Sequence, residues 1–168
     1  MKSFSKKLAT LLLATAVSAG TLPFAALNAQ AATPLTSQEI QRAVNELTQL
    51  RVLQGYPDHS MGVQQPISRA ELAKMVVQTF GLDGETGNSP SFRDVKKDAW
   101  YYDYAASVVA QDIFQSDGGR FQPNGKVTAA ELEQIIAKAL KRDLKSVQYW
   151  MTRVSTANSP LSRGEVAY

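Results

Sequence analysis

One four-residue motif occurs three times in this chain, each time directly after an apolar residue. The copies are Ser68-Arg69-Ala70-Glu71, Thr128-Ala129-Ala130-Glu131 and Ser162-Arg163-Gly164-Glu165. The first two copies begin at positions 68 and 128, an offset of 60 that also places Leu72 on Leu132. A helical unit that recurs in this way cannot easily bury its apolar face alone, so the copies are expected to pack on one another. The motif therefore predicts an all-α repeat protein.

The first 31 residues have the features of a secretory signal. A start with three lysines is followed by a mostly small and apolar stretch that ends in Ala29-Gln30-Ala31, a pattern that signal peptidase cuts. The alternative is a retained membrane anchor, which Gly20 and Pro23 disfavour because they interrupt the apolar run. We expect cleavage near Ala32 and a secreted chain that keeps no membrane segment.

Removing this signal makes the chain electrically neutral. The full sequence has 18 Lys and Arg against 15 Asp and Glu, and three of the lysines lie in the signal, so 15 basic residues remain against 15 acidic ones. A neutral chain without a basic run has little to attract a phosphate backbone, and nucleic acid is not an expected partner. The chain has no cysteine and one histidine, His59, too few for a histidine metal cluster or a histidine-based triad. Neither a metal nor a cofactor is expected.

Capping patterns predict where the helices begin. Thr36 and Glu39 form a capping box, in which a Ser or Thr is followed three residues later by Glu, and predict a helix that ends near Gln54. The three motifs contain the same box and predict helices over about 69–80, over about 129–141 and from 162 onward. A further helix is expected over about 99–113, opening with Trp100-Tyr101-Tyr102.

These elements divide the chain into five segments. They are the signal (1–31), repeat 1 (32–83), a Gly/Asn/Ser/Pro connector (84–90), repeat 2 (91–143) and a shortened repeat 3 (144–168). An incomplete third repeat would leave an apolar seam formed by Leu132, Ile136 and Leu140. Either self-association or a partner covers this seam, or residues 144–154 fold back over it. We expect association, since large exposed apolar patches are uncommon on soluble monomers.

Capping does not explain Arg69 and Arg163, which fall at the first helical position. The positive end of the helix dipole disfavours a cation there. A guanidinium beside exposed backbone amides favours an anionic ligand such as a carboxylate. The alternative is that these arginines are solvated or paired with a neighbouring acid such as Asp58.

Trp100 and Trp150 each fall at or near the start of a predicted helix that precedes one of the motifs. An aromatic ring beside a cationic site suits a sugar, because the ring face packs on the C–H face of a pyranose. The alternative for both residues is core packing.

Taken in order, these residues resemble the S-layer homology family. The matching segments are Phe92-Arg93-Asp94-Val95, Trp100, Phe121-Gln122-Pro123 and 127–131 in repeat 2, and Gly55-Tyr56-Pro57-Asp58 and 67–71 in repeat 1. The resemblance implies helix–loop–helix repeats in a pseudo-threefold helical bundle, with an incomplete third repeat. It also implies a non-catalytic anchor at the cell surface of a Gram-positive bacterium, whose grooves bind an anionic, often pyruvylated, secondary cell-wall polysaccharide.

The family's groove positions can be carried over to this chain. They fall on Arg69, Gly55, Tyr56, Asp58 and Trp100, and on Arg163 and Trp150 in the third copy. The second motif departs from the family because Ala129 stands in place of the arginine. We expect an exported polysaccharide-binding module that is not an enzyme. The alternative is an interaction or regulatory protein of the same fold that has lost part of its grooves and meets a partner chain.

Overall fold

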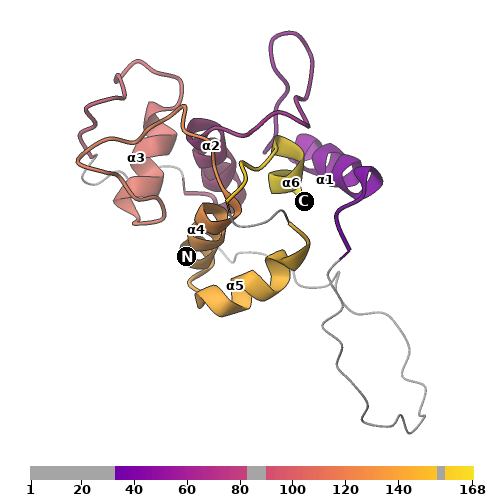
Figure 1. Cartoon of the computed structure of the whole chain (residues 1–168). Helices are drawn as coiled ribbons and strands as arrows, with labels where there is room; N and C mark the ends of the chain where they lie inside the picture. Colours follow the sequence, from indigo (N-terminus) through magenta and orange to yellow (C-terminus); the bar gives the residue numbers. More distant parts are fainter. Residues whose placement is uncertain (1–32, 83–89, 155–157) are drawn as a thin grey trace, which may run out of the picture. The chain divides into compact units, whose positions relative to one another are not determined.

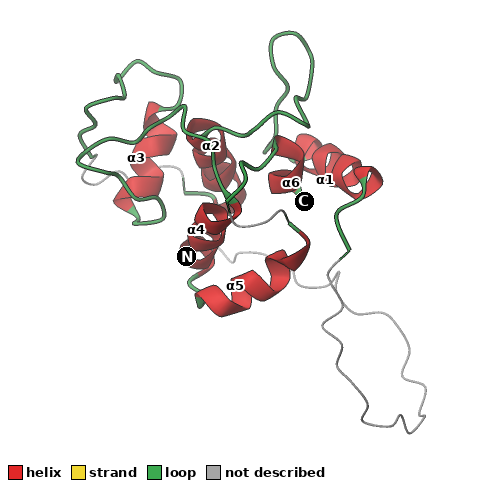
Figure 2. Ribbon diagram, viewed as in Figure 1, coloured by secondary structure: helices red, strands yellow, loops and turns green. Residues whose placement is uncertain are grey.

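The computed structural model describes residues 33–82, 90–154 and 158–168 (Figure 1). The predicted signal and most of the predicted connector lie outside these ranges. Figure 2 shows that the described residues form helices joined by long loops. In chain order the helices are α1 (Ser37–Gln49), α2 (Arg69–Phe80), α3 (Tyr102–Ala110), α4 (Ala129–Leu140), α5 (Leu144–Trp150), a 3-10 helix η1 (Met151–Arg153) and α6 (Arg163–Ala167). The all-α fold class is confirmed.

The helices begin where the capping boxes predict. Thr36, Ser68 and Ser162 each accept a hydrogen bond from the backbone N–H three residues later, and the glutamate at that position bonds back to the cap. In α4 only the first half of the box forms, with the side chain of Thr128 accepting from the N–H of Glu131. A cap of this kind contributes about 1 kcal/mol, which is enough to set where each helix begins.

The first helix of repeat 1 ends earlier than predicted, at Gln49 and not near Gln54. The backbone turns at Arg51, whose φ is 60°, and the N–H groups of Val52 and Leu53 then both donate to the carbonyl oxygen of Leu47, at 2.9 and 3.1 Å. This turn buries both side chains. Helical spacing alone does not separate such a buried turn from another turn of helix.

The predicted helix over about 99–113 is shorter for the same reason. It ends at Ala110, and Asp112 turns the chain with a φ of 56°. The N–H groups of Ile113 and Phe114 then both donate to the carbonyl oxygen of Val108, at 2.9 and 3.0 Å. Repeats 1 and 2 therefore end their first helices with the same turn.

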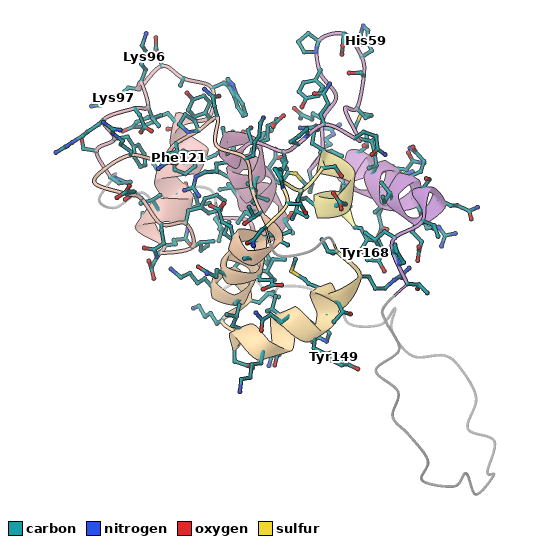
Figure 3. All side chains as sticks on the ribbon, viewed as in Figure 1. His59, Lys96, Lys97, Phe121, Tyr149 and Tyr168 are labelled. Atoms are coloured by element: carbon teal, nitrogen blue, oxygen red, sulfur yellow. The ribbon has the colours of Figure 1, made fainter. Side chains whose placement is uncertain are left out.

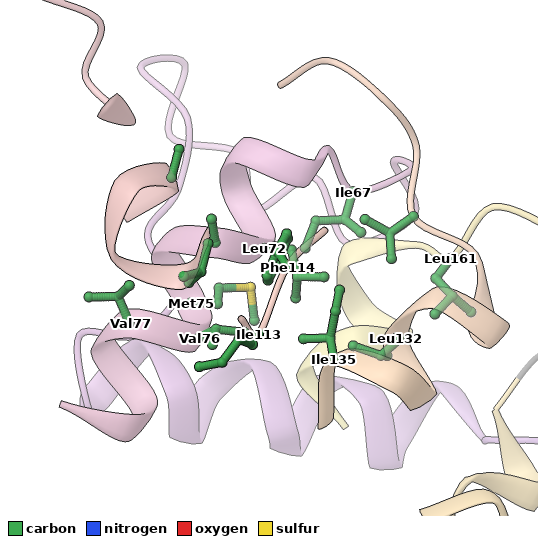
Figure 4. Close-up of a cluster of buried hydrophobic side chains, with 14 of the residues drawn as sticks. Ile67, Leu72, Met75, Val76, Val77, Ile113, Phe114, Leu132, Ile135 and Leu161 are labelled. Carbon is green, nitrogen blue, oxygen red and sulfur yellow. The ribbon is translucent and has the colours of Figure 1, made fainter. Parts of the chain in front are cut away.

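The residue before each motif lies at the centre of the molecule. The N–H of Ile67 donates to the oxygen of Leu161 at 2.9 Å, that of Leu161 to the oxygen of Val127 at 2.8 Å, and that of Val127 to the oxygen of Ile67 at 3.3 Å. These three hydrogen bonds form a closed ring that joins the three repeats. All three side chains are fully buried, and Figure 4 shows Ile67 and Leu161 in the surrounding apolar cluster. This ring is the pseudo-threefold centre that the resemblance implies.

Each second helix of a repeat packs on the first helix of another repeat. The pairs are α2 with α3, α4 with α5, and α6 with α1 (Figure 1). The close approach of α6 to α1 explains why the third motif contains Gly164, since a Cβ there would lie 2.6 Å from side-chain atoms of Ile40 and Val63. The pairing of α6 with α1 closes the ring of repeats.

The expected apolar seam is largely covered within the chain. Leu132 is buried in the core beside Ile135 (Figure 4), and α5 packs on α4 with Val147 buried. The third segment thus folds back over α4, which is the second of the two alternatives. Leu132 is covered without a second chain, because the short third repeat still supplies both of its helices. Leu140 stays 42% exposed.

Candidate functional site

The arginine of the third motif reaches from α6 into repeat 1. Its Nη1 donates to Oε1 of Glu71 at 2.7 Å, its Nη2 to the carbonyl oxygen of Gln54 at 2.8 Å and its Nε to that of Met61 at 3.1 Å. The guanidinium carbon lies 4.6 Å from the centre of the Tyr56 ring. Arg163 is only 4% exposed, and these internal partners occupy three of its five N–H donors.

The arginine of the first motif makes the same kind of crossing, from α2 into repeat 2. Its Nε donates to the oxygen of Phe121 at 2.7 Å and its Nη2 to that of Gln115 at 2.8 Å, and its Nη1 pairs with Glu131. The guanidinium carbon of Arg69 lies 5.3 Å from the ring centre of Phe114 and 5.1 Å from that of Phe121. Both motif arginines therefore bind the motif glutamate of another repeat.

These contacts correct the hypothesis that each arginine lies unpaired at the start of its own helix and is free to bind an anionic ligand there. The alternative, a paired arginine, holds for both residues, but Asp58 is not the partner. The carboxylate of Asp58 accepts instead from the backbone N–H and the hydroxyl of Ser60, at 2.9 and 2.7 Å, and these bonds lower its pKa. The true partners, Glu71 and Glu131, lie 92 and 62 residues away along the chain, which explains why spacing did not indicate them.

The carboxylate of Glu71 is ionised in its contact with Arg163. Its carboxylate accepts from the N–H and hydroxyl of Ser68 at 2.9 and 2.6 Å and from the hydroxyl of Tyr56 at 2.7 Å, in addition to Arg163. Burial raises the pKa of Glu71, but the bonds from Ser68 and Tyr56 and the charge of Arg163 outweigh it, so the pKa lies below its ordinary value. The pKa of Tyr56 is raised, by burial first and then by its bond to Glu71.

A groove of about 330 Å³ opens beside buried Arg163. We call it groove 1, and its lining includes Gln54, Gly55, Tyr56, Lys74, Trp100 and Arg163. Trp100 comes from repeat 2, in the turn before α3, and is 59% exposed. Four of the predicted site residues, Gly55, Tyr56, Trp100 and Arg163, therefore lie in one groove. The core-packing alternative is wrong for Trp100.

Lys74 is a residue of groove 1 that the sequence analysis missed. Its Nζ donates to Oε1 of Gln54 at 2.7 Å, and within the described ranges no carboxylate pairs with it. Burial, and then the positive charge of Arg163, lower the pKa of Lys74. An ammonium has three donors, so Lys74 can still meet a carboxylate in the groove. Its position three residues after Glu71, on the same helix face, was the available signal.

Arg69 lies in a second groove, apart from Gly55 and Tyr56. This groove 2 has a volume of about 310 Å³ and is lined by Arg69, Gln115, Ser116, Asp117, Arg120, Phe121 and Gln122. Each motif arginine therefore contributes to a groove of the repeat to which it crosses and not to a groove of its own repeat.

Trp150 lies apart from grooves 1 and 2. It ends α5 and does not begin it, so it is not the counterpart of Trp100. The residue is 61% exposed, and its neighbour Tyr149 is 76% exposed and projects from α5 in Figure 3. Core packing is therefore wrong for Trp150 as well.

A third groove of about 470 Å³ lies where repeats 3 and 1 meet. Groove 3 is lined by Pro34, Leu35, Ile40, Gln64, Pro66, Arg153, Pro160, Ser162 and Glu165. Its arginine belongs to a cluster that we call the clasp, formed by Arg153, Glu39 and Tyr168. Arg153 pairs with both oxygens of Glu39, at 2.9 and 3.0 Å, and contacts the hydroxyl of Tyr168 at 3.0 Å. The bond from Arg153, and then those from Thr36, lower the pKa of Glu39 to about 2.

Comparison with known proteins finds a family model that matches segments of repeats 1 and 2. Residues 36–73 and 91–132 match the model of the S-layer homology domain. The Surface-layer 125 kDa protein of Lysinibacillus sphaericus is 34% identical over 60% of this chain and 8% of its own length. The Middle cell wall protein of Brevibacillus brevis is 26% identical over 96% of this chain and 17% of its own length. A Bacillus anthracis protein described as an uncharacterized cell wall amidase is 30% identical over 60% of this chain and 19% of its own length.

The chain thus spans less than a fifth of the length of each of these relatives. Their surface-layer and cell-wall descriptions confirm the predicted location at the cell surface and support the predicted anchoring there. In the described part of the chain, no helix has the length and apolar character that crossing a membrane requires. Two segments of the chain, one in repeat 1 and one in repeat 2, thus match the S-layer homology domain family, as the motifs predict.

Proposed function

We propose that this chain binds an anionic secondary cell-wall polysaccharide in groove 1 and so holds the protein at the cell wall. The observation that carries the proposal is the exposed ring of Trp100 in the same groove as the ammonium of Lys74. A ring face and a cation side by side suit a sugar that bears a carboxylate, such as a pyruvylated residue. The cell-wall relatives point to the same class of polymer.

Each residue of groove 1 has a distinct role in this proposal. The ring of Trp100 packs on the C–H face of the sugar, and Lys74 pairs with its carboxylate. Arg163 is already bound to Glu71 and two carbonyl oxygens, so it shapes the groove floor and holds Tyr56 in place. Gly55 lets the groove wall pack closely on the turn that follows, because a Cβ there would lie 3.1 Å from the carbonyl oxygen of Ser60.

The proposed role is binding and not catalysis. One relative is described as an amidase, so repeats of this family also occur in chains described as enzymes. In groove 1 the carboxylate of Glu71 is held ionised by hydrogen bonds and an ion pair. A general acid needs a raised pKa, and the pKa of Glu71 is lowered.

Co-sedimentation of the secreted chain with purified cell-wall sacculi tests the proposal. We expect the chain to pellet with intact sacculi and to stay in solution when the secondary polysaccharide has been stripped chemically. Polysaccharide without its pyruvyl groups should bind poorly, and added salt should weaken binding to the intact polymer because the Lys74 contact is ionic. Equal pelleting with intact and stripped sacculi would rule out this polymer as the ligand.

A further inference from the structure

Groove 3 contains a motif glutamate that lacks the arginine found in the other two grooves. In grooves 1 and 2, Oε1 of Glu71 and of Glu131 each receives a guanidinium from another repeat. The corresponding acid in groove 3 is Glu165, and the motif residue that would reach it is Ala129. Oε2 of Glu165 caps α6 through the N–H and hydroxyl of Ser162, both at 2.8 Å. Considering residues 33–82, 90–154 and 158–168, Oε1 of Glu165 has no partner.

Two cations at this groove, Arg153 and Lys126, contact groups other than Glu165. Arg153 lines groove 3, but its guanidinium is bound to Glu39, to Tyr168 and, at 2.9 Å, to the carbonyl oxygen of Thr33. Lys126 reaches the rim, where its Nζ lies 3.5 Å from the carbonyl oxygen of Pro66. The charges of Arg153 and Glu39 cancel within the clasp. The carboxylate of Glu165 therefore remains as the unpaired acid of the groove lining.

We propose that groove 3 binds an arginine side chain of another protein chain, with its guanidinium on Oε1 of Glu165. The molecule itself provides the precedent, since the same oxygen of two equivalent glutamates binds a guanidinium. The groove's volume of about 470 Å³ admits an arginine side chain, and Pro34, Ile40 and Pro160 offer an apolar wall for its aliphatic stem. A glycan fits this site less well because no aromatic side chain is among the lining residues that the structure describes. This site is independent of the function proposed for groove 1.

Amide chemical shifts of the secreted chain test the proposal, with N-acetyl-arginine methylamide as the probe. We expect shifts at Ser162 to Glu165 and at Gln64, with a dissociation constant on the order of millimolar. N-acetyl-lysine methylamide should bind several-fold more weakly because an ammonium lacks the paired donors of a guanidinium. Equal binding of the two probes, or shifts confined to other regions, would overturn the proposal.

Three variants make the test specific. Glu165→Gln keeps a side chain that can complete the capping box but removes the charge, and it should weaken arginine binding by about tenfold. Glu46→Gln removes an exposed acid on α1 and should leave binding unchanged. Ala129→Arg restores the missing motif arginine, whose guanidinium should occupy Oε1 of Glu165 as that of Arg69 occupies Oε1 of Glu131, and it should block the probe. If Ala129→Arg does not fold, Glu165→Gln still decides, since probe binding that equals wild type in this variant would exclude Glu165 as the acceptor.

Discussion

Grooves 1 and 2 are built around the same arginine geometry, yet they offer a ligand different chemistry. Arg163 and Arg69 each bind a motif glutamate and two backbone oxygens, and the Nε partners, Met61 and Phe121, are 60 residues apart in register. Both arginines are largely buried, with side chains 5% and 12% exposed. Because the arginine makes the same kinds of contact in both grooves, it does not by itself decide which groove binds the polysaccharide.

The difference lies in the residues around each arginine. At the same offset of 60, Tyr56 of groove 1 corresponds to Ser116, and Lys74 corresponds to Gln134. In groove 2 the guanidinium contacts two phenylalanine rings that stack on each other, whereas in groove 1 it lies over one tyrosine ring beside an open cavity. The comparison indicates that the motif arginine joins the repeats and that its surroundings provide recognition.

The largest expected effect comes from removing the groove 1 arginine. Arg163→Ala leaves the carboxylate of Glu71 and two carbonyl oxygens without their partner in a buried site, which should lower the free energy of unfolding by about 3–5 kcal/mol. Arg69→Ala should lower it by about 2 kcal/mol, since that pair is more exposed. Urea unfolding monitored by circular dichroism measures both. Equal losses would mean that the difference in burial between the two pairs has no energetic consequence.

The second prediction compares two exposed tryptophans, one inside and one outside groove 1. Trp100→Ala should weaken polysaccharide binding by roughly 1–2 kcal/mol, about tenfold in affinity, because the ring face is lost. Trp150→Ala is the matched control, since Trp150 is equally exposed but lies outside the groove, and binding should not change. Titration with soluble polymer measures both affinities. If Trp150→Ala weakened polysaccharide binding and Trp100→Ala did not, the binding site would lie at α5 and not in groove 1.

The third prediction exchanges the cation between the two grooves. Lys74→Gln gives groove 1 the residue found in repeat 2 and should weaken binding by several-fold while making it less sensitive to salt. The reciprocal change, Gln134→Lys, adds a cation to α4 and should leave groove 1 binding unaltered. Affinity measured at low and high salt separates the two effects. An unchanged salt dependence in Lys74→Gln would show that another group carries the ionic contact.

The sequence predicts the local features of this fold better than its long-range contacts. Helix starts follow from residues three apart, so the capping boxes at Thr36, Ser68 and Ser162 were read correctly. The helix ends at Gln49 and Ala110 were missed because a left-handed turn buries the next apolar residues just as another turn of helix would. The crossing of Arg163 to Glu71 spans 92 residues and depends on how the repeats pack, which no local pattern contains.

The fourth prediction, which has the smallest expected effect, compares how acid changes the stability contributed by the clasp and by groove 1. The pKa of Glu39 is lowered from 4.5 to about 2, by the Arg153 bond first and then by Thr36. The unfolded chain therefore takes up this proton near pH 4.5, while the folded chain does so only near pH 2. The clasp's contribution to stability is complete above about pH 4.5 and is lost as the pH falls toward about 2. Glu39→Gln should lower the urea midpoint slightly at neutral pH, because exposed ion pairs contribute little, and should flatten its decline in acid.

Glu71 has its lowered pKa in a more buried site, so the Glu39→Gln variant should keep the acid sensitivity that comes from groove 1. The difference between the two acid profiles then isolates the clasp, and the decline that remains in the variant includes the contribution of Glu71. Urea midpoints collected from neutral pH down to roughly pH 3 provide both curves. Parallel curves for wild type and Glu39→Gln would contradict the lowered pKa of Glu39 and would assign the acid response to the buried glutamate of groove 1.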